Sequence, residues 1–258
     1  MASVLFIPDR FMDYRMWSDV PDRLRDRAEA IHFDQSEPVP WTAANGGFLT
    51  AARLMAPARG FSIVAAAGQA ARFGFAVAEA GLANGLVLFS PWLDRVVPET
   101  RAVLDEVDLS AEVEPFVPIA EALGEPDPGR RREILLQVVR ETIGPGLDPA
   151  ELDLALAMAS DHAEEYFADL RAAAAVATDD TPQPDPPWLE HPWVDRLGDL
   201  NLPVMVVVGP RARSLALAIA ARAKDAEIVI SAASPGLAPV AERIRTAQLI
   251  DRMLDRVS

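Results

Sequence analysis

The chain has 258 residues, of which half are hydrophobic, no cysteine, and a formal net charge of −15 at pH 7. This length suits one large core, and the lack of cysteine excludes disulfides, a thiol nucleophile and thiolate metal ligands. The negative charge argues against a nucleic-acid partner held through its phosphates. The first residues lack a basic signal region, and no apolar run approaches the ~20 residues of a spanning helix. We therefore expect a cytoplasmic protein with no membrane contact.

Short apolar runs alternate with helical patterns through the first 90 residues and again near the C-terminus. The predicted strands are 3–7, 28–33, 61–66, 85–90, 202–209 and 227–231. The predicted helices of this part are 17–27, 42–56, the stretch after Gly68, 212–224 and a last helix ending near 257. Such alternation indicates βαβ units, and hence an α/β fold with about six parallel strands flanked by helices.

The middle of the chain differs from both ends. Residues 98–182 show helical patterns without a convincing strand, and they hold 20 acidic but only 6 basic residues. A long helix predicted over 149–176 places His162 on its apolar face. We interpret 98–182 as an acidic helical cap, inserted between the fourth and fifth strands of a core made of 1–97 and 183–258. Such a cap would cover the carboxyl ends of the strands, where open α/β sheets bind ligands.

Residues 61–73 read Phe-Ser-Ile-Val-Ala-Ala-Ala-Gly-Gln-Ala-Ala-Arg-Phe, a buried strand that turns through glycine into an Ala-rich helix. Together with the first strand and the segment 195–209, this stretch resembles the α/β-hydrolase family over nearly the whole chain. The resemblance implies a nucleophile elbow at 66–70, an acid after the fifth predicted strand, and a histidine in the loop before the last helix.

The resemblance places the three catalytic positions on Gly68, Ala212 and Leu237, none of which can do triad chemistry. A shifted register does not restore the triad. No Ser, Thr, Cys or Asp lies between 63 and 89, no Asp or Glu lies between 201 and 224, and no histidine follows 191. We therefore assign no catalytic residue and expect no ordinary serine-hydrolase activity.

Five residues remain as candidates for binding a ligand. Asp9 and Arg10 stand where the family usually has His-Gly, although such a pair is often only an ion pair on a loop. Gly68 preserves the turn, and the backbone N–H of Gln69 would point from it toward a bound oxygen. His162 would face the pocket or be a packed histidine of the cap. No metal-ligand spacing and no Gly-rich phosphate motif is present, so neither a metal nor a cofactor is expected.

Three functions fit these features. The first is a pseudo-hydrolase that binds a small, mostly apolar molecule between core and cap, as a sensor, carrier or accessory protein. The alternative is an enzyme of non-triad chemistry, such as a lyase, isomerase or cyclase, in the same pocket. The second alternative is an interaction module whose acidic cap binds a protein partner or a second copy of the chain. The identity of the ligand does not follow from the sequence.

Overall fold

A computed structural model describes residues 1–9, 12–33, 46–91, 117–142, 144–168, 171, 193–209, 213–231 and 238–258. Its centre is a six-stranded sheet of order β2-β1-β3-β4-β5-β6, in which every neighbouring pair is parallel. The strands are β1 (Ala2–Ile7), β2 (Ala28–His32), β3 (Ile63–Ala67), β4 (Leu86–Phe89), β5 (Val204–Val208) and β6 (Ala226–Ile230). The predicted parallel sheet is thus confirmed.

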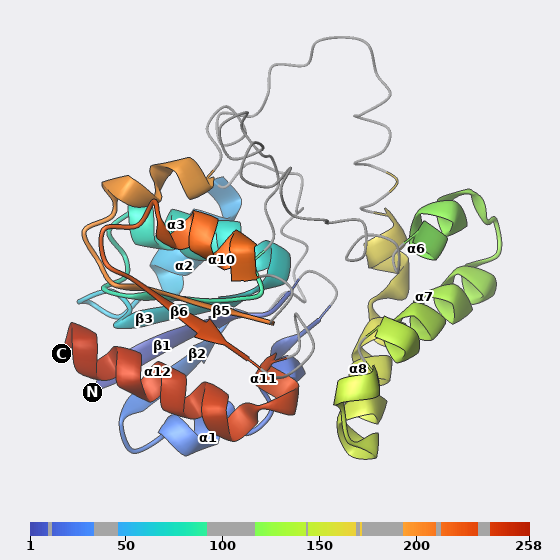
Figure 1. Ribbon diagram of the computed structural model, residues 1–258, viewed down its shortest axis with the longest axis horizontal. Helices are drawn as coiled ribbons and strands as arrows, with labels where there is room; N and C mark the ends of the chain where they lie inside the picture. Colours follow the sequence, from blue (N-terminus) through green and yellow to red (C-terminus); the bar gives the residue numbers. More distant parts are fainter. Residues whose placement is uncertain are drawn as a thin grey trace, which may run out of the picture.

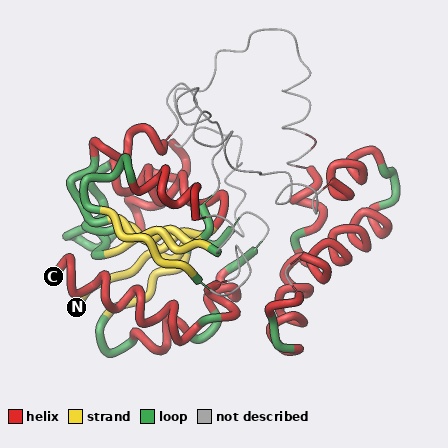
Figure 2. The backbone as a smooth tube through the Cα atoms, viewed as in Figure 1, coloured by secondary structure: helices red, strands yellow, loops and turns green. Residues whose placement is uncertain are grey.

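Helices cover both faces of this sheet, with α2, α3 and α10 on one side and α1, α11 and α12 on the other (Figure 1). The layers are equally plain when the backbone is coloured by secondary structure (Figure 2). The helices of this part are η1 (Tyr14–Trp17), α1 (Val20–Leu24), α2 (Gly46–Met55), η2 (Gly68–Ala70), α3 (Ala71–Glu79), η6 (Trp193–Asp199), α10 (Arg213–Ala220), α11 (Ala238–Ala241) and α12 (Arg243–Val257), where η marks a 3-10 helix.

The central strands are buried on both faces, which explains their continuous apolar sequences. Every residue of β3, β4 and β5 is buried. Strands covered by helices on both sides have this composition, whereas half-exposed strands alternate. Small residues allow the elbow helix to approach closely, since a Cβ added to Gly74 of α3 would lie 2.9 Å from the Cβ of Ala66.

The part of the chain between β4 and β5 that the structure describes is helical. It forms α6 (Val117–Glu121), η4 (Ala122–Gly124), α7 (Pro128–Thr142), η5 (Gly144–Gly146) and α8 (Pro149–Asp161), which gather to one side of the sheet (Figures 1 and 2). Arg131 of α7 is only 6 % exposed and holds these helices together by binding Glu164 and the carbonyl of Glu125. The ends of the cap at 98 and 182 lie outside the described residues and stay predictions.

Two predicted helices are interrupted. The helix expected over 149–176 ends at Asp161, and His162 leaves the helical path with φ −103° and ψ 8° before helix resumes at 163–168. The helix expected over 17–27 is split into η1 and α1, between which Ser18 has φ 48°. Pro21 lies in the first turn of α1, because a residue without a backbone N–H suits a helix start and not its interior. No helix in the described part of the chain is long and apolar enough to cross a membrane.

Candidate functional site

The turn after β3 has the geometry that its sequence predicts. β3 ends at Ala67, Gly68 takes φ +54°, and η2 leads at once into α3. Side chains other than glycine rarely adopt this backbone conformation without strain. The strand, the tight turn and the helix that a nucleophile elbow requires are therefore present, and the turn residue is Gly68.

The carboxylate of Asp9 fills the space where a side chain of residue 68 would begin. A Cβ built on Gly68 would lie 1.9 Å from Oδ2, 2.2 Å from Cγ and 2.5 Å from Oδ1 of Asp9. Asp9 is 5 % exposed, and its backbone N–H lies 3.3 Å from Sδ of Met16. The sequence-predicted residues Asp9 and Gly68 thus meet, and no other side chain fits at position 68 while Asp9 stays in place.

The sheet register adds Ser90 to this pair. Ile7 pairs with Ala66, and Ala67 pairs with Phe89, so the next level along the sheet contains Asp9, Gly68 and Ser90. The N–H of Ser90 donates to the carbonyl of Val207 over 2.7 Å, which continues the ladder beyond β4. Ser90 is 9 % exposed and has φ +45°, an unusual conformation for serine that often marks a functional site. Sequence reasoning missed it, because it reads only as the last residue of a strand.

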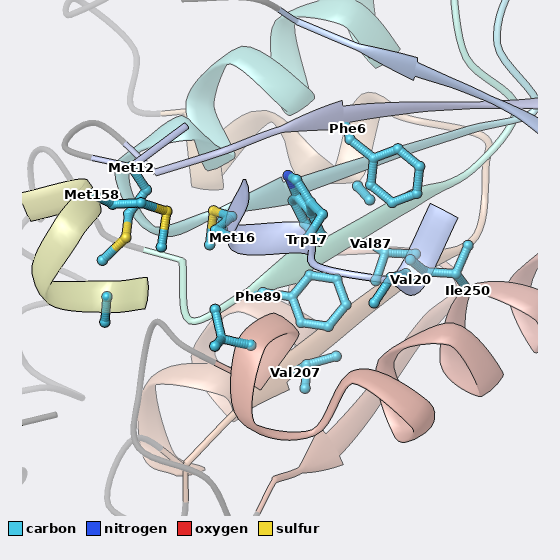
Figure 3. Close-up of a cluster of buried hydrophobic side chains, with 14 of the residues drawn as sticks. Phe6, Met12, Met16, Trp17, Val20, Val87, Phe89, Met158, Val207 and Ile250 are labelled. Atoms are coloured by element: carbon cyan, nitrogen blue, oxygen red, sulfur yellow. The ribbon is translucent and has the colours of Figure 1, made fainter. Parts of the chain in front are cut away.

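Three methionines lie near Asp9, where the core meets α8. The N–H of Met12 donates to the carbonyl of Asp9 over 2.9 Å, and Met12, Met16 and Met158 are each no more than 2 % exposed. Figure 3 shows Met12 beside Met158 of α8, with Met16 between them and Trp17. Flexible thioether side chains adapt to differently shaped partners, which is why they are common at surfaces that bind varied apolar ligands.

Trp17 continues this apolar cluster into the core. Its ring packs against Phe6 and Phe89, with centroid distances of 5.0 and 5.6 Å (Figure 3). Trp17 is fully buried, and its indole N–H has no hydrogen-bond partner in the structure as described. A buried N–H donor without an acceptor lowers the stability of a fold. The Trp17 side chain, which packs against β1 and β4, is therefore a second unusual feature of this region after the positive φ of Ser90.

His162 belongs to a charged contact between core and cap. Its Nε2 lies 3.2 Å from Oδ2 of Asp13, and its Nδ1 lies 3.3 Å from Oε2 of Glu165. Arg15 strengthens the contact, because its Nη2 binds Asp13 over 2.6 Å and Asp161 at the end of α8 over 2.7 Å. Both ring nitrogens of His162 therefore have carboxylate partners, and through Asp13 His162 connects the cap to the loop after β1.

Asp13 binds both Arg15 and His162 at this contact between core and cap, and these contacts affect its pKa. Burial acts to raise the pKa of the Asp13 carboxyl, but hydrogen bonds from Arg15 and His162 outweigh burial and hold the pKa below its ordinary value. Asp13 also accepts the backbone N–H of Arg15 over 2.8 Å and so caps η1. The carboxylate is thus ionised, and it anchors the loop that carries Asp9.

The remaining predicted positions do not enter the site as described. Arg10, Ala212 and Leu237 lie outside the described residues, as does the side chain of Gln69. In the described ranges no three His, Asp or Glu side chains come together as metal ligands. His32, at the end of β2, stacks on Phe6, and burial lowers its pKa.

Solved structures with the same architecture include an esterase and an enol-lactonase. A thermophilic esterase from Thermogutta terrifontis matches with a TM-score of 0.64 and 19 % identity, over 100 % of this chain and 90 % of its own. MenH from S. aureus matches with a TM-score of 0.69 and 13 % identity, over 99 % and 94 %. The enol-lactonase from Burkholderia xenovorans LB400 matches with a TM-score of 0.64 and 14 % identity, over 98 % and 91 %.

No family model matches the sequence, and no curated protein is similar to it at the level of sequence. At such low identities the structural likeness establishes the fold and nothing finer. The chain therefore has the α/β-hydrolase fold, with Gly68 at the turn between β3 and α3. Its activity has to be argued from its own residues.

Proposed function

We propose that this chain is an α/β-hydrolase-fold protein without a working triad, which binds a small, mostly apolar molecule between core and cap. The observation that carries the proposal is the overlap between the Asp9 carboxylate and the Cβ position of Gly68. An ester hydrolase of this fold needs a hydroxyl or thiol at that point. Here the carboxylate of Asp9, from the loop after β1, occupies the position where that side chain would begin.

The sequence supports the same conclusion. The family positions of the acid and the histidine fall on Ala212 and Leu237, and no histidine follows residue 191. Because a nucleophile, a base and an orienting acid act as a unit, the loss of all three removes most of the rate. The esterase and lactonase activities named for the structural neighbours are therefore not carried over to this chain.

The apolar character of the ligand is inferred from the methionines. Met12 and Met16 lie beside Asp9, and Met158 meets them from the cap (Figure 3). These thioethers are buried, so a molecule bound between core and cap would reach them only by moving their side chains. Since Met side chains change rotamer at little cost, they can make room for an alkyl or aromatic group.

A second candidate function is favoured by the burial of Asp9. A buried carboxylate beside the turn at Gly68 can act as a general base or acid in non-triad chemistry, and Asp9 is 5 % exposed. This would make the protein a lyase, isomerase or cyclase. The two candidates share one site and differ in whether Asp9 exchanges a proton with the bound molecule.

The binding proposal can be tested through the methionines themselves. The chain has seven methionines, which give seven resolved signals when their methyl groups are labelled with ¹³C. On titration with 1-octanol, the signals of Met12, Met16 and Met158 should shift. Met253 is the internal control, because it contacts Gly85 at the amino end of β4, on the opposite edge of the sheet. Saturable shifts confined to Met253, or no shifts at all, would contradict the proposal.

The enzyme question needs a separate assay. We expect hydrolysis of p-nitrophenyl acetate, butyrate and octanoate to stay at the rate of buffer alone. A rate typical of esterases would overturn the pseudo-hydrolase proposal. The nearly isosteric Asp9→Asn variant then separates the remaining possibilities, since loss of that rate would assign the chemistry to Asp9.

A further inference from the structure

The contact between core and cap contains more negative than positive charge. In the described part of this contact the carboxylates of Asp13, Asp161 and Glu165 surround one permanent cation, the guanidinium of Arg15. Arg15 binds Asp13 and Asp161, over 2.6 and 2.7 Å, and so does not neutralise Glu165. A protonated His162 would supply the second positive charge, because it lies between Asp13 and Glu165.

The two ring nitrogens of His162 face two different carboxylates. Nε2 lies 3.2 Å from Oδ2 of Asp13, and Nδ1 lies 3.3 Å from Oε2 of Glu165. An ionised carboxylate only accepts hydrogen bonds, whereas a neutral imidazole has one N–H donor and one bare nitrogen. A neutral His162 therefore donates to one carboxylate, while its bare nitrogen faces the lone pairs of the other. Only the imidazolium form donates to both.

From this geometry we infer that protonation of His162 strengthens the contact between core and cap, and that loss of this proton at higher pH loosens it. His162 follows α8 of the cap, whereas Asp13 and Arg15 belong to the core, in the loop after β1 and in η1. Histidine is the side chain whose charge ordinarily changes between pH 5 and 8. The position of the cap would thus depend on pH. This regulation goes beyond the proposed binding function and can be tested without a ligand.

The charged groups around His162 come from three elements, and their arrangement assigns the response to His162. Hydrogen bonds from Arg15 and His162 hold the pKa of Asp13 below its ordinary value, so Asp13 stays ionised between pH 5.5 and pH 8. The guanidinium of Arg15 keeps its charge at every such pH. From α7, which packs against α8, Arg131 is bound to Glu164 over 2.8 Å and so has its own partner.

Two spin labels can measure the position of the cap, because the chain has no cysteine of its own. Gln137 of α7 and Gln248 of α12 are exposed, and each is replaced by cysteine and labelled. Pulsed electron paramagnetic resonance gives the distances between the labels at pH 5.5 and pH 8, at one ionic strength because salt screens exposed charges. The ratio of docked to displaced cap should be at least about fivefold higher at pH 5.5, since a charge-assisted hydrogen bond is stronger than a neutral one.

Two variants of one residue assign the response. His162→Gln keeps a hydrogen-bond donor but has no titratable charge, so it should give the pH 8 distribution of distances at both pH values. His162→Lys is positively charged at both, so it should give the pH 5.5 distribution at both. His32→Gln is the matched control, because His32 stacks on Phe6 in the core, and it should leave the response unchanged.

The outcomes decide the inference without reference to a ligand. Equal distributions at pH 5.5 and pH 8, or a cap displaced at pH 5.5, would overturn it. So would a response that persists in His162→Gln or is lost in His32→Gln. If neither variant at 162 folds, the ring signals of ¹⁵N-labelled histidine make the assignment, since those of His162 must change over the same pH range as the distances. The methionine titration tests the binding function separately, so either proposal can fail alone.

Discussion

Two aspartates in the loop after β1 have opposite surroundings. Asp9 is 5 % exposed, its carboxylate lies against the backbone turn at Gly68, and its backbone N–H lies 3.3 Å from Sδ of Met16. The side chain of Asp13 is 18 % exposed and lies among charged groups, with Arg15 at 2.6 Å and His162 at 3.2 Å. Asp13 thus joins the core to the cap, whereas Asp9 fills the space where a side chain of residue 68 would begin.

The same residue type therefore has two different structural roles here, and the surrounding groups decide which one. The charged groups around Asp13 are protein side chains, so its contribution is to hold the loop and the cap in place. Asp9 is fixed by shape, because it fits only where residue 68 has no side chain. The pair predicts that changes at Gly68 disrupt the site itself, while changes at Asp13 weaken only the contact between core and cap.

The largest effect is expected for Gly68→Ala. The added Cβ would overlap the Asp9 carboxylate at 1.9 Å, and alanine would be strained at φ +54°. Strain and overlap together should lower the free energy of unfolding by about 3 kcal/mol or more. Urea denaturation followed by circular dichroism measures the loss.

Gly81→Ala isolates the contribution of strain. Gly81 has φ +69°, but a Cβ there would have no atom within 4 Å, so its variant should lose only about 1 kcal/mol. Adding Asp9→Ala to Gly68→Ala should recover most of the remaining difference, because the overlapping atoms are removed. Equal losses at both glycines would show that the contact between Asp9 and Gly68 does not constrain the fold.

The fold followed from the sequence because its signals are local. Apolar runs such as 61–66 and 202–209 mark strands, Gly68 marks the turn, and their alternation with helices fixes a parallel sheet. The strand boundaries moved by one or two residues, whereas the helix predicted over 212–224 ends at Ala220. The breaks at Ser18 and His162 were missed, because the periodicity of apolar residues continues across a change of direction.

The candidate site was only partly predictable. Asp9 and Gly68 were chosen from their positions in the chain, but their overlap depends on distances between strands that no motif encodes. The positive φ of Ser90 arises from the backbone path beyond β4 and leaves no mark in the sequence. The contact between His162 and Asp13 joins residues 149 positions apart, so helical spacing alone could not identify Asp13 as the partner of His162.

A smaller effect is expected for Asp13→Ala. The change removes the cap of η1 and the partner of both Arg15 and His162, and it should cost about 1–2 kcal/mol at pH 7. Asp19→Ala is the matched control, because the side chain of Asp19 makes no capping hydrogen bond at α1 and forms an exposed ion pair with Arg23 one turn along that helix. It should cost at most about 0.5 kcal/mol. Equal losses would mean that the contacts of Asp13 with Arg15 and His162 add nothing to the free energy of unfolding.

The contribution of Asp13 should also depend on pH. The pKa of Asp13 is lower in the folded protein than in the unfolded chain, so its contribution is complete above the unfolded pKa of about 3.9. It is lost as the pH falls further, through the folded pKa. The difference in stability between the unmodified protein and Asp13→Ala should therefore shrink as the pH falls from 5 toward 3. A difference that grows below pH 4 would contradict this assignment.

The smallest effect is expected for Trp17→Phe. The smaller ring gives up part of the packing against Phe6 and Phe89, which is destabilising, but it also removes a buried N–H that lacks an acceptor in the described structure. These two changes oppose each other, so the net loss on urea denaturation should stay within about 1 kcal/mol, against about 3–5 kcal/mol for Trp17→Ala. A loss in Trp17→Phe close to that of Trp17→Ala would mean that the indole N–H makes a valuable hydrogen bond in solution.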